Sequence, residues 1–269
     1  MLSLMSKSNL NNNYKPFFLP SFLTFIIFLV VGNIYLSNPS QAISVAPIKG
    51  NICLVIDDFG FSLNKDVKGF FELNKNITLA IIPGAPYTQI IGEYADSLGF
   101  ETIIHMPMEP YAYDSISEKD FILSELLNAS EVEERINLAF LEIPTAVGMN
   151  NHQGSKATAN LQLMKNVARS LKKRNKFFLD SFTNPESRGF ITMRRFGVKT
   201  ELRQVFLDHI EDTLYIQKQL DSLVQLSHSM DVAIGIGHVK PITLDILKKE
   251  IPRLKSDGYN FVPLSKIVR

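Results

Sequence analysis

The chain has 269 residues, 45% of them hydrophobic and 20% charged, a composition typical of globular proteins. Its 28 Lys and Arg residues nearly balance its 27 Asp and Glu residues. The basic excess of nucleic-acid-binding proteins is therefore missing, and no nucleic acid is expected as a partner. Cys53 is the only cysteine and lies in an apolar run, so an internal disulfide is excluded and a small core residue is expected.

Residues 1–42 differ from the rest of the chain. Lys7 and Lys15 are their only charged residues, and a nearly unbroken apolar run follows at 17–36. A small-x-small pattern ending at Ala42 predicts a secretory signal cleaved after that residue. The alternative is an uncleaved membrane anchor, because about 20 apolar residues can span a bilayer. Either way we expect export to the periplasm or the outer face of the inner membrane, with membrane contact only through this segment.

Residues 43–50 are the expected linker, and one domain is expected over 51–269. In that region, short apolar runs alternate with segments of helical periodicity. The expected strands lie at 51–56, 78–82, 101–105, 146–150, 177–180, 203–207, 231–236 and 260–262. The clearest helical segments lie at 88–98, 161–171, 213–229 and 244–254. This alternation predicts a (β/α) barrel or an open doubly wound sheet, with strands buried on both faces.

Five of the expected strands end in polar residues of the types used in catalysis. These ends are Asp57-Asp58, His105, Asn150-Asn151-His152, Asp180 and His238. The carboxyl ends of parallel strands meet at one rim, so we expect these side chains to lie close together. Asp208 ends another apolar run, and we expect it to form a buried ion pair with Arg203 or to support the site.

The adjacent carboxylates of Asp57 and Asp58 repel each other beside a buried strand unless a cation compensates. A divalent metal is the simplest compensation. Alternatively, one carboxylate caps the next segment and the other faces solvent. Asp58, His105 and His152 supply one carboxylate and two imidazoles, a donor set that suits zinc, although nickel, cobalt or iron would fit similarly.

Taken in order, the strand ends resemble motifs of the divergent polysaccharide deacetylases of bacteria, relatives of the metal-dependent polysaccharide deacetylases. The matching segments are Ile56-Asp57-Asp58-Phe59-Gly60, His105-Met106-Pro107-Met108-Glu109, Gly148-Met149-Asn150-Asn151-His152-Gln153-Gly154-Ser155, Phe178-Leu179-Asp180-Ser181 and Gly235-Ile236-Gly237-His238. The resemblance covers residues 50–269. It implies a distorted (β/α) barrel of seven or eight strands in a single domain.

The resemblance also implies roles for individual residues. The relatives' paired-Asp motif has a base followed by a metal ligand, which implies these roles for Asp57 and Asp58. His105 and His152 match the two metal histidines. His238 matches the late histidine that acts as general acid.

Asp180 resembles a further aspartate of the relatives, which lies after a middle strand and implies a supporting catalytic role. The chain departs from the relatives in two places. Their metal histidines usually share one HxxxH segment, whereas Glu109 stands four residues after His105. Their Arg-x-Pro-x-aromatic segment is not evident in this chain.

The resemblance implies a metal-dependent hydrolase that removes acetyl groups from a polysaccharide or peptidoglycan-type glycan. Together with the export expected from residues 1–42 and the donor set that suits zinc, it predicts an exported zinc enzyme that acts on an envelope glycan. The two departures keep a second class of function open. A domain of this kind can bind a glycan or an envelope protein without turning it over.

Overall fold

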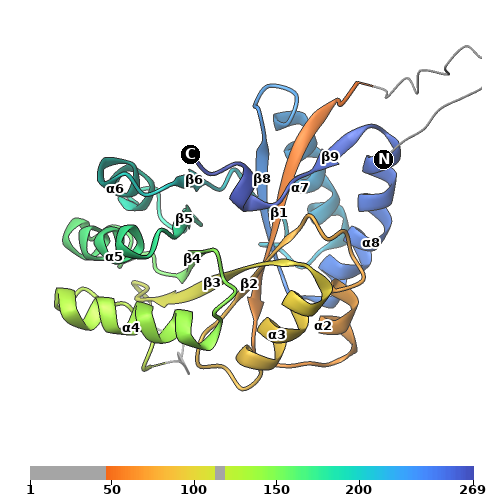
Figure 1. The fold of residues 1–269 in the computed structure, drawn as a ribbon. Coiled ribbons are helices and arrows are strands. Elements are labelled where there is room, and N and C mark those ends of the chain that lie inside the picture. The colour runs from red at the N-terminus through yellow and green to blue at the C-terminus, as the bar shows by residue number, and fades with distance from the viewer. Residues whose placement is uncertain (1–46, 113–118) are drawn as a thin grey trace, which may run out of the picture. The chain divides into compact units, whose positions relative to one another are not determined.

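The computed structural model describes residues 47–112 and 119–269. A curled parallel sheet runs through this part of the chain, with helices on its outer side (Figure 1). The expected signal or anchor at 1–42 and the first residues of the expected linker lie outside the described residues. Within the described ranges, no helix is long and apolar enough to cross a membrane.

Nine strands form the sheet of the described residues, and all their pairings are parallel. They are β1 (Gly50–Phe59), β2 (Thr78–Ile81), β3 (Glu101–Met108), β4 (Gly148–Gln153), β5 (Phe177–Asp180), β6 (Thr200–Leu202), β7 (Val205–Phe206), β8 (Ala233–His238) and β9 (Tyr259–Phe261). Eight follow the order β6-β5-β4-β3-β2-β1-β8-β7, and β9 pairs with β1 off this path. A doubly wound sheet reverses its strand order near the middle, whereas this order runs around in one direction. The predicted distorted (β/α) barrel is therefore confirmed.

The two edges of the curled sheet meet where the chain passes from β6 to β7. The N–H of Arg203 donates to the carbonyl of Asp180 at 3.1 Å, and the N–H of Gln204 donates to the carbonyl of Ile234 at 3.0 Å. The chain thus changes its pairing partner from β5 to β8 in one step. The prediction of a single strand at 203–207 is therefore wrong. The segment begins at Thr200 and forms two short strands, β6 at one edge of the sheet and β7 at the other.

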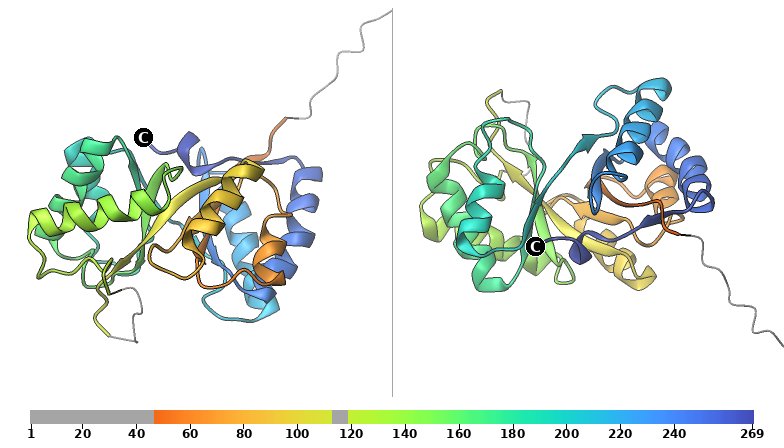
Figure 2. Two further views of the ribbon diagram at one scale, coloured as in Figure 1. Left: turned by 60° about the horizontal axis from the view of Figure 1, so that its bottom comes forward. Right: turned by 90° about the horizontal axis from the view of Figure 1, so that it is seen from above.

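Seven α-helices among the described residues cover the outside of the sheet (Figure 2). They are α2 (Lys65–Phe70), α3 (Thr88–Leu98), α4 (Ala129–Glu142), α5 (Leu161–Arg174), α6 (Gly189–Phe196), α7 (Thr213–Leu226) and α8 (Pro241–Ser256), and a 3₁₀ turn (Leu264–Lys266) follows. In four helices, the polar side chain before the first turn accepts hydrogen bonds from backbone N–H groups of that turn, and α4 has a reciprocal capping box between Asn128 and Glu131. α4, α5 and α6 cover the part of the sheet around β3 to β5, and the other helices cover the rest.

The strands bury their side chains in two apolar cores, one inside the curled sheet and one between the sheet and the helices. In β1, Cys53 and Val55 belong to the inner core, whereas Leu54 and Ile56 belong to the outer one. Successive side chains of a strand point to opposite faces, and here both faces are covered. This double burial explains why the strands are continuously apolar in the sequence.

Candidate metal centre and active site

Strand alternation brings the candidate residues to one rim. In β1, Val55 faces the inner core and Asp57 occupies the next inward position two residues later. β3 and β8 repeat this pattern, with His105 two residues after the inward Ile103 and His238 two residues after the inward Ile236. Asp57 and His238 are direct neighbours in the register between β1 and β8. Apolar strands thus deliver a carboxylate and two imidazoles to the mouth of the barrel.

A β-bulge near the end of β1 brings Asp57 and Asp58 to the same place. Ile56 pairs with Leu79 and Phe59 with Ile81, so β1 has one more residue than β2 in this interval. Asp58 occupies the left-handed region with φ +70°, which is uncommon for a residue other than glycine. In a regular strand these adjacent side chains would point to opposite faces, so the bulge is what lets both approach one imidazole.

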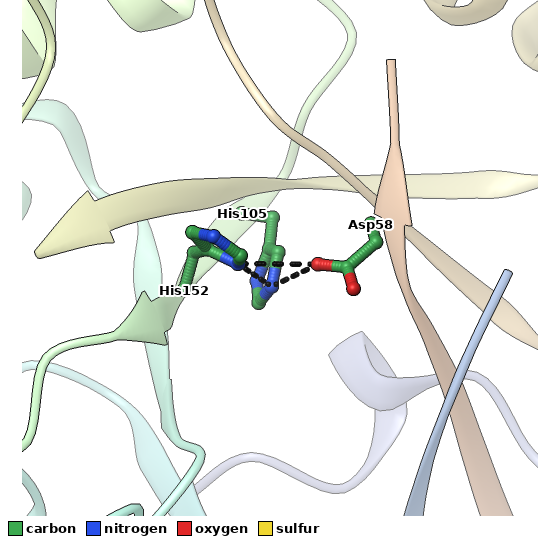
Figure 3. Close-up of side chains that lie close together, drawn as sticks. All are labelled: Asp58, His105 and His152. Carbon is green, nitrogen blue, oxygen red and sulfur yellow. Dashed lines mark hydrogen bonds and ion pairs between the residues drawn. The ribbon is translucent and has the colours of Figure 1, made fainter. Parts of the chain in front are cut away.

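The three predicted metal ligands meet in a triangle of donor atoms (Figure 3). Nδ1 of His152 lies 3.1 Å from Oδ1 of Asp58 and 3.1 Å from Nε2 of His105. Nε2 of His105 lies 3.2 Å from the same oxygen of Asp58. The ligands come from β1, β3 and β4, so three strands supply one donor each, and β2 lies between the first two of them.

The triangle has the chemistry and the size of a metal site. Oδ1 of Asp58 is buried and has no well-formed hydrogen bond to any described residue, so its charge lacks a fixed donor. Zinc bonds of about 2.0–2.2 Å to nitrogen and oxygen separate neighbouring ligands of a tetrahedral site by roughly 3.3 Å. The observed spacing therefore fits one face of such a site and leaves a further position for substrate or water.

Asn150 fixes the orientation of His105. The amide nitrogen of Asn150 donates to Oδ1 of Asp57 at 2.9 Å, so the amide oxygen faces the other way. That oxygen lies 2.7 Å from Nδ1 of His105. Because the oxygen can only accept, we infer that Nδ1 carries the proton and that Nε2 presents its lone pair to the triangle. Asn150 thus links the predicted base to a predicted metal ligand.

Burial opposes ionisation of both neighbouring carboxyls, with different outcomes. The carboxyl of Asp57 is almost fully buried, which raises its pKa, although His105 and His238 partly offset the rise. For Asp58, the two imidazoles outweigh burial and hold the pKa well below its usual range. Burial also acts to lower the pKa of His105, but Asp57 and Asp58 outweigh it and raise that pKa. Asp58 therefore stays a carboxylate, the form that binds a cation, and Asp57 has the raised basicity of a proton acceptor.

Asp208 is the partner of His238. Its Oδ1 lies 2.6 Å from Nδ1 of His238, and its Oδ2 accepts bonds from the N–H of His238 at 2.7 Å and the hydroxyl of Thr243 at 2.6 Å. Burial acts to lower the pKa of His238, but the hydrogen bond and charge of Asp208 outweigh it and raise the pKa to about 9. With Nδ1 held by Asp208, Nε2 is the nitrogen that remains to exchange a proton.

The expected ion pair between Asp208 and Arg203 is not present within 4.0 Å, and the alternative of support for the site fits the contacts of Asp208. Sequence reasoning missed the specific links that Asn150 and Thr243 make. The polar cluster at 150–152 was a signal for the first of them, whereas nothing in the sequence pairs Thr243 with Asp208.

Asp180 does not join the cluster. Its Oδ2 accepts bonds from the hydroxyl of Ser187 at 2.7 Å and the N–H of Phe190 at 2.9 Å, and its Oδ1 accepts from the N–H of Phe182 at 2.9 Å. Asp180 lies on the outer face of β5, and its carboxylate holds the start of α6. The predicted supporting role in catalysis has no basis in these contacts, because strand alternation turns the side chain away from the mouth of the barrel.

Glu109, which stands where the relatives have a second metal histidine, is also engaged elsewhere. Its Oε1 accepts a bond from Nζ of Lys156 at 2.8 Å, and its Oε2 accepts one from the N–H of Glu125 at 3.1 Å. This carboxylate fastens the segment after β3 to the segment after β4. His152, on β4, is the second imidazole of the triangle.

Comparison with known proteins shows the family and agrees with the fold. The family model described as divergent polysaccharide deacetylase matches residues 54–268. An uncharacterized protein of Haemophilus influenzae is 32% identical over 235 residues, which cover 87% of this chain and 83% of that protein. The uncharacterized protein YibQ of Escherichia coli is 32% identical over 216 residues, which cover 80% of this chain and 67% of that protein.

Solved structures show the same fold at low sequence identity. An uncharacterized protein from Agrobacterium tumefaciens is similar with a TM-score of 0.78 and 21% identity, over 84% of this chain and 91% of that chain. A CE4 family pseudoenzyme from Bacillus anthracis is similar with a TM-score of 0.50 and 14% identity, over 84% of this chain and 70% of that chain. The family model spans nearly the whole described domain, and the chain therefore belongs to the divergent polysaccharide deacetylase family.

Proposed function

We propose that this protein is a metal-dependent hydrolase that removes acetyl groups from a polysaccharide of the cell envelope. The observation that carries the proposal is the donor triangle of Asp58, His105 and His152, with a candidate base and a candidate acid beside it. Oδ2 of Asp57 lies 3.6 Å from the Nε2 of His105 that belongs to the triangle. His238 stands opposite Asp57 on the neighbouring strand.

Residues of this chain supply the proton transfers. A divalent metal such as zinc, when bound, polarises a carbonyl oxygen and lowers the pKa of water to about 7. Asp57 accepts a proton from the attacking water as the water oxygen bonds to the acetyl carbon. His238 gives a proton from Nε2 to the departing nitrogen or oxygen as its bond to that carbon breaks. Acetate and a free amine or hydroxyl are the products.

Metal removal tests this proposal. Purified full-length protein is expected to release acetate from acetylated envelope glycans, to lose this activity after treatment with a chelator, and to regain it when zinc is added. Nickel, cobalt and iron are compared in the same assay, because each accepts imidazole and carboxylate ligands. Acetate release that is unchanged after complete metal removal would contradict the proposal.

We further propose that the protein acts outside the inner membrane, in the periplasm or attached to the outer face. The charge and apolar pattern of residues 1–36 supports export. N-terminal sequencing of the mature protein is expected to give Ile43 if the signal is cleaved after Ala42. An intact Met1 in the membrane fraction would identify an anchor instead, and full-length protein found only in the cytosol would refute both forms.

A second candidate function is glycan or envelope-protein binding without turnover. Two observations favour it: the metal histidines come from two strands rather than one HxxxH segment, and a pseudoenzyme has a similar fold. A comparison of glycan binding with acetate release distinguishes the two functions. Metal-loaded protein that binds peptidoglycan fragments but releases no acetate from any of them would establish the binding function.

A further inference from the structure

Arg203 is held rigidly at the mouth of the barrel beside the candidate acid. Its Nε donates to the carbonyl of Ser181 at 2.7 Å, and its Nη2 donates to the carbonyl of Phe182 at 3.0 Å. Its guanidinium carbon lies 3.6 Å from the centre of the Phe206 ring. The Phe206 ring in turn stacks on the imidazole of His238, with 5.8 Å between ring centres and 27° between planes. One aromatic ring therefore links the guanidinium to the imidazole.

The charge of Arg203 is only partly compensated by the protein. No carboxylate of the described residues lies within the 4.0 Å of an ion pair, and the two bonds of the guanidinium go to neutral carbonyls. Burial lowers the pKa of Arg203 to about 10, and the more distant charges of Asp180 and Asp57 offset this only in part. A half-buried cation without a counter-ion is costly, so a negative group that arrives with a ligand would relieve the cost.

The free donors of Arg203 have a defined arrangement. A guanidinium has five N–H donors in a planar fork. The edge formed by Nε and Nη2 is bound to the two carbonyls. Three donors, on Nη1 and on the outer side of Nη2, therefore remain without a partner among the described residues. This remaining edge matches the two oxygens of a carboxylate, the partner with which arginine forms paired, parallel hydrogen bonds.

From this geometry we propose that Arg203 binds a carboxylate of the substrate, so that the protein prefers acidic glycans over neutral ones. The inference rests on the proposed glycan substrate. Because Phe206 and the two carbonyls already fix the guanidinium, little conformational entropy is lost when it binds. The carboxylate belongs to the acetylated sugar or to its neighbour, since only one aromatic ring separates Arg203 from His238. A lactyl ether and a uronic acid are two sources of such a group.

Matched disaccharides test the proposal by equilibrium binding to zinc-loaded, full-length protein carrying Asp57→Asn, whose turnover is expected to be reduced by roughly 10²–10⁴-fold. N-acetylglucosaminyl-N-acetylmuramic acid carries a lactyl carboxylate, di-N-acetylchitobiose lacks it, and the methyl ester of the first compound keeps its shape without the charge. An acetylated uronic acid disaccharide is the second carboxylate source. At least one of the two acidic ligands is expected to bind tenfold to a hundredfold more tightly than chitobiose, roughly the effect of a charged hydrogen bond.

The Arg203→Gln substitution is expected to bring the ratio of the affinities for the acidic and neutral ligands close to one. Arg203→Lys is expected to keep part of the preference for the acidic ligand. Arg194→Gln is the matched control, because Arg194 also lies over a phenylalanine ring, at 5.7 Å from the centre of Phe190, but on the exposed side of α6. Melting temperature and zinc content show whether each variant is folded. Should Arg203→Gln fail to fold, the acid and its methyl ester are compared on protein that retains Arg203.

Equal affinity for acidic and neutral ligands, no binding of either acid, or an unchanged preference in folded Arg203→Gln would overturn the proposal. Failure of the deacetylase function looks different. In that case the acidic glycan binds selectively through Arg203, while protein with Asp57 intact releases no acetate. Conversely, acetate release from ligands that bind equally well would support hydrolysis and refute the role of Arg203.

Discussion

Asp208→Asn is expected to reduce the turnover number of acetate release by roughly 10²–10⁴-fold at pH 8, the range typical of lost general acid catalysis. The amide keeps the shape of the buried carboxylate, which contacts His238 and Thr243, but it lacks the charge. Burial alone lowers the pKa of His238, and Asp208 is the main group that raises it. Without that charge, the imidazole is expected to be largely neutral at pH 8 and unable to donate a proton.

The direction in which activity and stability change with pH follows from the pKa of His238. The pKa of His238 is raised from 6.5 to about 9, so the imidazolium is present at neutral pH and is lost as the pH rises through about 9. Its contribution to folding stability is complete below about 6.5 and is lost over the same rise. In Asp208→Asn the alkaline limb of activity moves to about 6.5 or below.

The wild type, Asp208→Asn and Glu211→Gln are compared in the same metal-loaded state. Glu211→Gln is the control, because that exposed carboxylate contacts Lys240 and not the imidazole. The measurement is the pH profile of turnover, together with the pKa of His238 from NMR. An alkaline limb that stays near pH 9 in Asp208→Asn would show that another group is the acid.

His105→Ala and His152→Ala are each expected to lower the metal content from about one ion per chain to near zero. Each substitution removes one of the three donors of the triangle, and two remaining ligands hold zinc weakly. Asn150→Ala leaves all three donors in place but releases the ring of His105. It is therefore expected to weaken metal affinity by about 10- to 100-fold, as is usual when a group that orients a ligand is lost.

Metal content after purification without chelator, followed by competition against a chelator of known affinity, measures these effects. His209→Ala is the control, since this exposed histidine lies outside the triangle. Melting temperatures exclude global unfolding as the cause. Wild-type protein that binds no metal, or His105→Ala that binds it as tightly as the wild type, would refute the assignment of the ligands.

The sequence was sufficient for the barrel and for much of its rim. Long apolar strands buried on both faces are visible as continuous runs, and their polar ends mark the positions of His105, His152 and Asp58. The resemblance of the ordered motifs then selected a barrel over a doubly wound sheet. These features depend on local sequence, which is why they could be predicted.

Other features of the fold and the site could not be predicted, because they depend on which face of a strand a residue occupies or on pairing between distant segments. Asp180 follows Leu179, but only the structure shows that Leu179 faces inward and Asp180 outward. Asp208 and His238 are 30 positions apart in the sequence, and the pairing of the short β7 with β8 brings them into contact. The apolar pattern of the sequence does not show that β7 is separate from β6. The bulge at Asp58 could not be predicted from the sequence either, because its φ of +70° occurs at an aspartate and not at a glycine, the residue that usually marks this conformation.

Acetate release by metal-loaded Asp57→Asn, compared with that of the wild type, tests the proposed hydrolysis most sharply. In the proposed mechanism, a metal held by the triangle and the carboxylate of Asp57 act together in hydrolysis. The variant is expected to keep about one metal ion per chain and the wild-type fold, while its turnover falls by roughly 10²–10⁴-fold. Full turnover by folded, metal-loaded Asp57→Asn on the same acetylated glycan would show that Asp57 is not the base.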